Sequence, residues 1–367
     1  MSRARAGMRV AGTPAILICA LALLVGCDFA ADYSGTKGGS GALANVHGFA
    51  VPEGRSSPTG RLAQAVALDP RGPEAGIVLE PAWDDGTPDP YREADLAEAV
   101  AQGASSFGLI PARAFDRWPE ASLPALSAPF QLHSMEQAAA VARSGAVADY
   151  LSRLESVGLV GIAAIPEEIR HPASLSPLRH PDQFRALRFR TAQADALFEA
   201  DLLGALGATP VADAPPSGIA SGEVDAAETS LGWLPTLAGN LTITGDIDLW
   251  VKFDVLVADS EAWEALSDAQ REALRAVAED LALSPIDRDD AATRACALGY
   301  RVAVTSAAAR DAFAERVSPA VRGLLADPAH APVVEAMRDA VSAHPAREYE
   351  PPELCRPRTG DAARPDH

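Results

Sequence analysis

The chain has 367 residues, which is enough for two domains, and carries 50 acidic against 31 basic residues, a formal net charge of −19. Such an acidic surface argues against nucleic acid and anionic lipid headgroups as partners, because both repel it. The sequence contains no G-x-S-x-G, H-E-x-x-H, P-loop or G-x-G-x-x-G motif and no cysteine–histidine cluster. We therefore expect no enzymatic activity, no metal and no cofactor.

The N-terminus has the parts of an export signal. Three arginines and no acid precede the apolar run AILICALALLV (15–25), which Gly26 and Cys27 follow. This run is too short for an ordinary membrane-spanning helix. LVGC (24–27) resembles the bacterial lipobox, which implies a signal peptide of residues 1–26 and acylation of Cys27. The alternative is a plain secretory signal that happens to contain a cysteine.

Loss of the signal peptide would change the formal charge from −19 to −22, because its only charged residues are three arginines. Residues 27–45 are rich in Gly and Ser, which predicts a flexible tether, and residues 356–367 are predicted to be a disordered tail. With Cys27 acylated, Cys296 and Cys355 remain. Outside the cytoplasm such a pair favours a disulfide over a metal site, and it would attach the C-terminal segment to a helix.

The body of the chain alternates between helical and strand-like patterns. In chain order, the patterns predict a helix at 93–103, a strand at 105–110, a helix at 134–158, a strand at 159–165, a helix at 191–207, strands at 208–213, 223–229 and 250–259, and a helix at 267–283. Ser-x-x-Gln sequences begin the second and fourth helices as capping boxes. This alternation predicts an α/β protein whose sheets are covered by helices.

Several short segments, each weak alone, occur in an informative order. They are AEAVAQGASSFGLI (97–110), LPALSAPFQLHSMEQA (123–138), EEIRHPASLSPLRHPDQFRALRFRT (167–191), LLGALGATPV (202–211), SGEVDAAET (221–229) and the helix at 263–274. Their order and spacing over about half the chain resemble the solute-binding proteins of TRAP (tripartite ATP-independent periplasmic) transporters, of the dicarboxylate-binding DctP type.

This resemblance implies a two-domain periplasmic-binding-protein-like fold, with a sheet flanked by helices in each domain and a ligand cleft between them. Domain I would hold residues 46–167 and part of 251–350, and domain II would hold residues 168–250 and part of 284–350. The function implied is an extracytoplasmic lipoprotein, anchored to the cell membrane and monomeric. It would capture a small organic acid and deliver it to TRAP membrane subunits.

The resemblance also assigns a role to arginines in FRALRFRT (184–191). In the family, the second arginine of this strand binds the substrate carboxylate, and here it is Arg190. A planar guanidinium offers two parallel donors that match two carboxylate oxygens. Arg188 is the rival on geometry alone, because residues 188 and 190 of a strand face the same side. Arg170 corresponds to a second ligand-facing arginine, and the alternative for the arginines of this strand is a solvated surface.

Further ligand contacts are expected at the end of the strand at 223–229 and just after it. The family's Glu-Asn pair is Glu228-Thr229 here, and threonine keeps a hydrogen-bond donor with a shorter reach. Trp233 is expected either to line the ligand-binding cleft or to pack in the core. The preceding segment ADAPPSGIA (212–220) departs from the family, so the ligand's identity cannot be transferred.

Two other classes of function stay open at this point. A binding lipoprotein of an ATP-driven importer or a sensor would use the same cleft with a different membrane partner. An exported enzyme on an α/β scaffold would need a nucleophile, base or metal set, and the sequence shows none.

Overall fold

The computed structural model describes residues 45–83, 89–194, 196–212, 214–237, 240–283 and 287–355. Contacts divide the chain after Gly41, so every described residue belongs to the second unit. The predicted signal peptide, the tether apart from Asn45 and the C-terminal tail lie outside the described residues.

The strands are β1 (Asn45–Val51), β2 (Ile77–Trp83), β3 (Phe107–Pro111), β4 (Leu159–Ser174), β5 (Arg188–Arg190), β6 (Thr209–Val211), β7 (Ala226–Thr229), β8 (Thr242–Thr244), β9 (Trp250–Asp259) and β10 (Arg301–Ala303). The α-helices are α1 (Pro58–Leu68), α2 (Arg71–Glu74), α3 (Arg92–Ala101), α4 (Met135–Ala142), α5 (Gly145–Leu151), α6 (Leu197–Leu206), α7 (Gly218–Ser221), α8 (Ser260–Glu264), α9 (Asp268–Ala282), α10 (Arg288–Ala297), α11 (Ala307–Ala326) and α12 (Ala331–Ala343). Short 3₁₀ helices are η1 (Ala112–Arg117), η2 (Pro124–Ser127), η3 (Ser152–Val157), η4 (Pro181–Phe184), η5 (Leu234–Thr236) and η6 (Glu353–Cys355).

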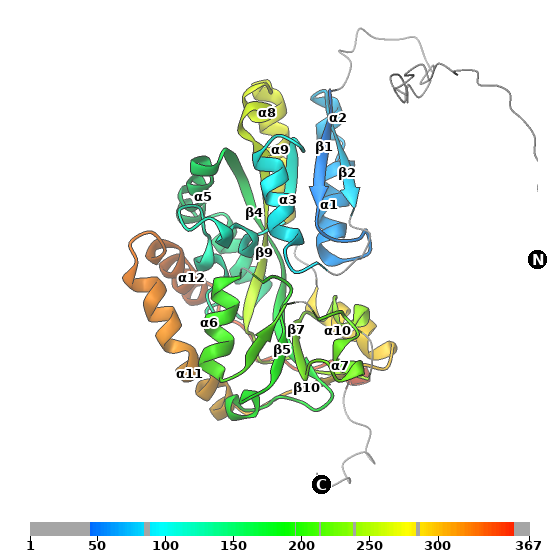
Figure 1. The fold of residues 1–367 in the computed structure, drawn as a ribbon, viewed down its shortest axis with the longest axis vertical. Coiled ribbons are helices and arrows are strands. Elements are labelled where there is room, and N and C mark those ends of the chain that lie inside the picture. The colour runs from blue at the N-terminus through cyan, green and yellow to red at the C-terminus, as the bar shows by residue number, and fades with distance from the viewer. Residues whose placement is uncertain are drawn as a thin grey trace, which may run out of the picture. The chain divides into compact units, whose positions relative to one another are not determined.

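The long antiparallel strands β4 and β9 connect two groups of shorter strands (Figure 1). On one side, β9 pairs with β3, which continues to β1 and β2 through parallel pairing. On the other side, the last residues of β4, from His171 to Ser174, leave β9 and pair with β7 and β8. Beyond β7 lie the parallel strands β5 and β6. One strand therefore belongs to both groups, and a register shift between Pro166 and Ile169 precedes the change of partner.

Helices cover each group of strands and bury three apolar clusters. The cluster around Phe49 and Leu256 lies where α1 and α9 pack near β1, β3 and β9. The largest cluster includes Phe184, Phe189 and Phe313 and is covered by α6, α11 and α12. The third, around Ile243, lies where α10 packs beside β10. Arrangement of helices on both groups of strands agrees with the predicted α/β class.

One predicted element is wrong. The helix expected over 134–158 is instead α4, α5 and η3, because Ser144 accepts a hydrogen bond from Val147 N and begins a new helix. The expected capping box at Ser134 is only half formed. Ser134 accepts from Gln137 N, but the Gln137 side chain accepts from His133 N and donates to His344 O. Gln137 Oε1 thus accepts from the residue before the N-cap instead of from Ser134 N, and the long-range bond to His344 uses the amide nitrogen of the same side chain.

Most other predicted elements are confirmed with small changes of boundary. β9 has the predicted bounds, and α9 begins with a complete capping box at Ser267 and Gln270. The strand predicted at 159–165 extends to Ser174. The helix predicted from 191 begins only at Leu197, and Gly207 ends it in the left-handed conformation.

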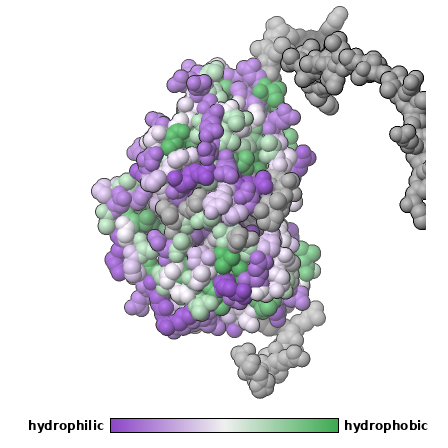
Figure 2. All heavy atoms as spheres, viewed as in Figure 1, coloured by the Kyte–Doolittle hydropathy of each residue, from purple (hydrophilic) through white to green (hydrophobic). Residues whose placement is uncertain are grey.

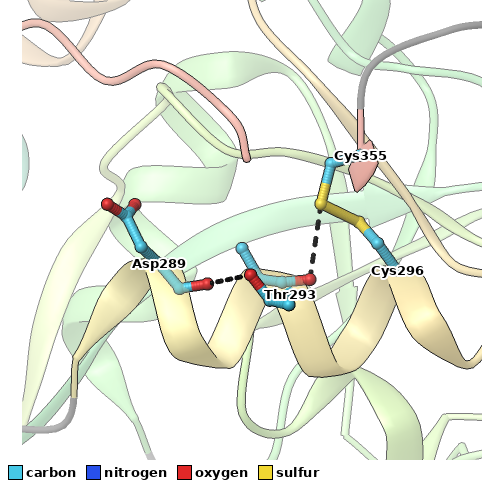
Figure 3. Close-up of a disulfide and its surroundings, with 5 residues drawn as sticks. Asp289, Thr293, Cys296 and Cys355 are labelled. Carbon is cyan, nitrogen blue, oxygen red and sulfur yellow. Dashed lines mark hydrogen bonds between the residues drawn. A yellow bond between two sulfur atoms is a disulfide. The ribbon is translucent and has the colours of Figure 1, made fainter. Parts of the chain in front are cut away.

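The C-terminal segment is attached to α10. Cys296 and Cys355 form a disulfide between α10 and η6, with Cα atoms 5.3 Å apart (Figure 3). In the same helix Thr293 Oγ1 donates to Asp289 O at 2.8 Å.

Hydrophilic side chains are spread over the face of the molecule that Figure 2 shows, with apolar ones between them. No described helix has both the length and the apolar character that a membrane span requires.

Candidate functional site

A cavity of about 230 Å³ lies where residues from both groups of strands converge. The loop after β1, the start of α3, η1, β4, β5, β7 and the segments that follow β7 contribute to its wall. The five residues predicted as ligand contacts all line it: Arg190, Arg170, Thr229, Glu228 and Trp233. They lie on strands far apart in the sequence, and the sheet brings them together.

Arg190 is held in place by the short strand β5 between β6 and β7. Its neighbour Phe189 is fully buried and stacks on Phe184, with ring centroids 5.5 Å apart, so the backbone of β5 is anchored in the core. Arg190 Nε donates to Ala214 O at 2.9 Å. Among the residues that the structure describes, Arg190 has no carboxylate partner, and none of them bonds to its two terminal amino groups.

The electrostatic surroundings of Arg190 are unusual for a guanidinium. Burial lowers its pKa, Arg113 and Arg170 lower it further, and Glu228 opposes them. A lowered pKa in a guanidinium means that its positive charge is incompletely compensated by the protein. An anion in the cavity would supply the missing compensation.

The other two arginines of the same stretch do not reach the cavity. Arg188 is exposed and pairs with Asp225, with Nη2 and Oδ1 2.8 Å apart. Arg185 is exposed and lies 3.2 Å from Asp182. Spacing along the strand left Arg188 and Arg190 equivalent, but the structure gives them different surroundings.

Arg170 and Glu228 form a buried ion pair beneath the cavity. Arg170 Nε donates to Glu228 Oε2, and Glu228 Oε1 lies 3.7 Å from Arg113 Nη1. Burial alone would raise the pKa of Glu228, but Arg170 and Arg113 outweigh it and hold the pKa at about 2. Glu228 is therefore ionised at neutral pH and neutralises most of the charge of Arg170.

Arg113 is a cavity residue that the sequence did not indicate. Its Nε and Nη2 donate to the two oxygens of Glu93, each at 2.8 Å, and its Nη1 donates to Glu199 Oε1 at 2.7 Å. Burial raises the pKa of Glu199 to about 7, although Arg113 opposes the shift. The only sequence signal was an arginine just after the buried strand β3, which is too common to identify a site.

Thr229 and Trp233 contribute polar groups near the ion pair. Thr229 is buried, and its Oγ1 donates to Ser230 O over a long 3.4 Å. Trp233 Nε1 is buried, and the described residues offer it no acceptor. Trp250, the first residue of β9, is not among the cavity-lining residues and packs in the largest apolar cluster.

Behind the cavity, Lys252 is surrounded by carboxylates. Its Nζ donates to Glu53 Oε1 at 2.8 Å, to Glu167 Oε1 at 3.0 Å and to Thr59 Oγ1 at 2.7 Å, and Asp254 Oδ1 is 3.5 Å away. Glu53 also lines the cavity, so it connects the cavity wall to this buried cluster. Within the described ranges, no group of His, Cys, Asp and Glu has an arrangement suited to a metal ion.

Comparison with known proteins gives one family match. The family model DctP, bacterial extracellular solute-binding protein, family 7, matches residues 88–323. A comparison with curated proteins finds no match.

Solved structures with the same fold are numerous. The sugar-acid-binding protein DctPAm of Advenella mimigardefordensis, in complex with galactonate, is 17% identical with a TM-score of 0.67, over 81% of this chain and 99% of that one. A TRAP solute-binding protein of Ralstonia eutropha with bound (S)-2-acetolactate is 20% identical with a TM-score of 0.67, over 82% and 99%. One of Shewanella oneidensis with bound succinate is 17% identical with a TM-score of 0.65, over 82% and 99%. These similarities confirm the predicted two-domain periplasmic-binding-protein-like fold.

Proposed function

This chain belongs to family 7 of the bacterial extracellular solute-binding proteins, and on that premise we propose that it captures a small organic acid by its carboxylate and delivers it to a TRAP-type secondary transporter. The similar structures described above hold galactonate, acetolactate and succinate, and each of these ligands carries a carboxylate. Binding and delivery require no change to the ligand's covalent bonds, so the proposal includes no catalytic residue.

The observation that carries the proposal is the state of Arg190. Its guanidinium has no carboxylate partner among the described residues, whereas Arg113 and Arg170 are paired with carboxylates. Two parallel N–H donors fit the two oxygens of a carboxylate, and the pair is stronger in a site that excludes water. We therefore assign the ligand's carboxylate to Arg190.

The other predicted contacts receive supporting roles in this proposal. Arg170 lines the cavity, and its Nη2, which has no partner among the described residues, would donate a hydrogen bond to the same carboxylate. Trp233 and Thr229 would contact the rest of the ligand, and Glu228 would hold Arg170 in its orientation. Each of these roles follows from a position on the cavity wall.

Ligand capture would close the two domains by a hinge movement. We place domain I at 46–167 with part of 251–350, and domain II at 168–250 with part of 284–350. The change of partner along β4 supports a boundary near residue 168. The remaining parts of the proposal are a monomeric protein, an acyl anchor at Cys27, which lies outside the described residues, and docking onto TRAP membrane subunits.

A thermal-shift screen of the purified protein against small organic acids tests the proposal. A ligand at a hundred times its Kd should raise the free energy of unfolding by about 2.7 kcal/mol. Arg190→Ala should abolish this stabilisation, and Arg190→Lys should weaken it because a lysine cannot form the two-donor pair. Arg188→Ala is the matched control: it removes an exposed arginine of the same strand and should leave binding unchanged. If Arg190→Ala still responds like the wild type, the assignment is wrong.

A further inference from the structure

The formal charges on the described part of the cavity wall add up to zero without a ligand, although Arg190 has no carboxylate partner of its own there. On the part of the wall that the structure describes, four arginines face four carboxylates, so its formal charge is zero. Binding of a monoanion gives the occupied site one negative charge, and binding of a dianion gives it two. Each uncompensated charge removed from water costs free energy.

The arginines differ in how much of their charge is available. Arg113 is bonded to both Glu93 and Glu199. Arg170 is bonded to Glu228 and lies 3.6 Å from Glu167. Arg92 has a partner of its own. Arg190 therefore supplies the charge for one carboxylate, and a second carboxylate would meet Arg113 and Arg170, which are already paired with carboxylates of the protein.

The carboxylates of the wall oppose a second negative charge directly. Glu53, Glu93 and Glu228 all line the cavity, and the lowered pKa values of Glu93 and Glu228 keep both ionised. Because the wall is largely buried, repulsion between like charges is screened less than in water. A dicarboxylate would place its second group within reach of this repulsion.

The unpaired polar atoms near the cavity favour a different kind of substituent. Within the described ranges, Glu53 Oε2 and Glu228 Oε1 have no donor, and Trp233 Nε1 has no acceptor. A hydroxyl group both donates and accepts, whereas an ionised carboxylate only accepts. These atoms lie beneath the cavity surface, so contact with a ligand requires side-chain rotation as the cleft closes.

From this geometry we infer that the ligand is a hydroxylated monocarboxylic acid and not a dicarboxylic acid. The inference rests on the proposed function and narrows it: one carboxylate binds Arg190, and neutral hydroxyl groups face the acidic part of the wall. Selectivity then comes from rejection of a second charge as much as from attraction of the first.

Acids that differ in one group give the sharpest test. Galactonate and galactarate differ by a terminal CH₂OH or carboxylate, and 3-hydroxybutanoate and malate differ by a methyl or carboxylate. In whichever pair binds, titration calorimetry on the purified protein should give the monoacid a Kd at least about tenfold lower than that of the diacid, a difference of about 1.4 kcal/mol in binding free energy. The hydroxylated acid should also bind more tightly than its deoxy counterpart, as 3-hydroxybutanoate against butanoate.

A variant separates charge rejection from simple fit. Glu53→Gln removes one wall carboxylate and should reduce the preference for the monoacid, whereas Glu120→Gln, at an exposed position, should leave the preference unchanged. A diacid that binds as tightly as its monoacid twin, with binding lost in Arg190→Ala, would overturn this inference and leave the proposed function standing. If no acid binds, or if binding survives Arg190→Ala, the proposed function itself fails.

Discussion

Arg170 on β4 and Glu228 on β7 form an ion pair whose side chains are 6% and 0% exposed. The two residues are 58 positions apart in the sequence, and the pair links neighbouring strands directly beneath the cavity. Because Arg113 on η1 also approaches Glu228, one carboxylate joins three elements of the wall. The orientation of the arginines around the cavity therefore depends on a charge that never contacts bulk water.

Loss of either member of this pair should destabilise the protein strongly. Arg170→Met and Glu228→Gln each leave a buried charge without its partner, and we expect a loss of about 3–5 kcal/mol in the free energy of unfolding. The double variant should lose less than the sum of the two single ones, because no unpaired charge is left between them. Urea unfolding at neutral pH measures the free energy of unfolding of the two single variants and the double variant. If the losses of the single variants add up to that of the double variant, the pair does not act as a unit.

The sequence allowed the fold to be predicted where local patterns determine structure. β9 and α9 could be read from an apolar run and a capping box. The break at Ser144 could not, because a Ser-Gly step inside an amphipathic pattern becomes a helix start only when the chain must turn there. Likewise Gln137 Oε1 accepts from His133 N and not from Ser134 N, and its Nε2 donates to His344 O across 207 positions, a contact that no local pattern encodes.

The candidate site, too, could be predicted from the sequence only where short motifs determine it, and not where long-range contacts do. A resemblance of short motifs was enough to select Arg190, Arg170 and Glu228 as cavity residues. Spacing in the strand could not distinguish Arg188 from Arg190. The difference comes from Asp225, which lies just before β7 and pairs with Arg188. Arg113 was missed because its partners are 20 and 86 positions away. Charge pairing of this kind becomes visible only in three dimensions.

Stability should depend on pH through Glu168. Burial, with the neighbouring Glu167, raises its pKa from 4.5 to about 7, although Ser230 and Arg170 oppose the shift. A carboxyl group whose folded pKa is raised binds its proton more tightly in the folded state. Its stabilising contribution is therefore complete below pH 4.5 and is lost as pH rises toward 7 and above. The slope is at most about 1.4 kcal/mol per pH unit for one proton.

Glu168→Gln should reduce this loss of stability between pH 5 and 8, because glutamine stays neutral throughout. Urea unfolding at several pH values measures the slope, and Glu335→Gln, at an exposed position of α12, serves as the control. Asp254 and Glu199 also have pKa values raised to about 7, chiefly by burial, so the slope should diminish without disappearing. An unchanged slope in Glu168→Gln would contradict the assignment.

Lys252 should be essential to the stability of the acidic cluster behind the cavity. It is the cation that Glu53, Glu167 and Asp254 share, and all four side chains are nearly inaccessible to water. Lys252→Met should lower the free energy of unfolding by about 3–5 kcal/mol, because the carboxylates would then repel each other without compensation. Asp254→Asn in the same chain should restore part of the loss. Thermal unfolding measures both variants, and a Lys252→Met protein as stable as the wild type would exclude this role.

The disulfide between Cys296 and Cys355 should stabilise the fold without affecting the ligand. It closes a loop with a sequence separation of 59, for which chain entropy in the unfolded state predicts a contribution of about 4 kcal/mol. Reduction of the wild-type protein, or Cys296→Ser with Cys355→Ser, should lower the unfolding midpoint to the same extent. Neither cysteine lines the cavity, so the Kd for an organic acid at a temperature where both forms are folded should not change. A reductant that shifts the midpoint of the double variant as well would show that the effect does not come from this bond.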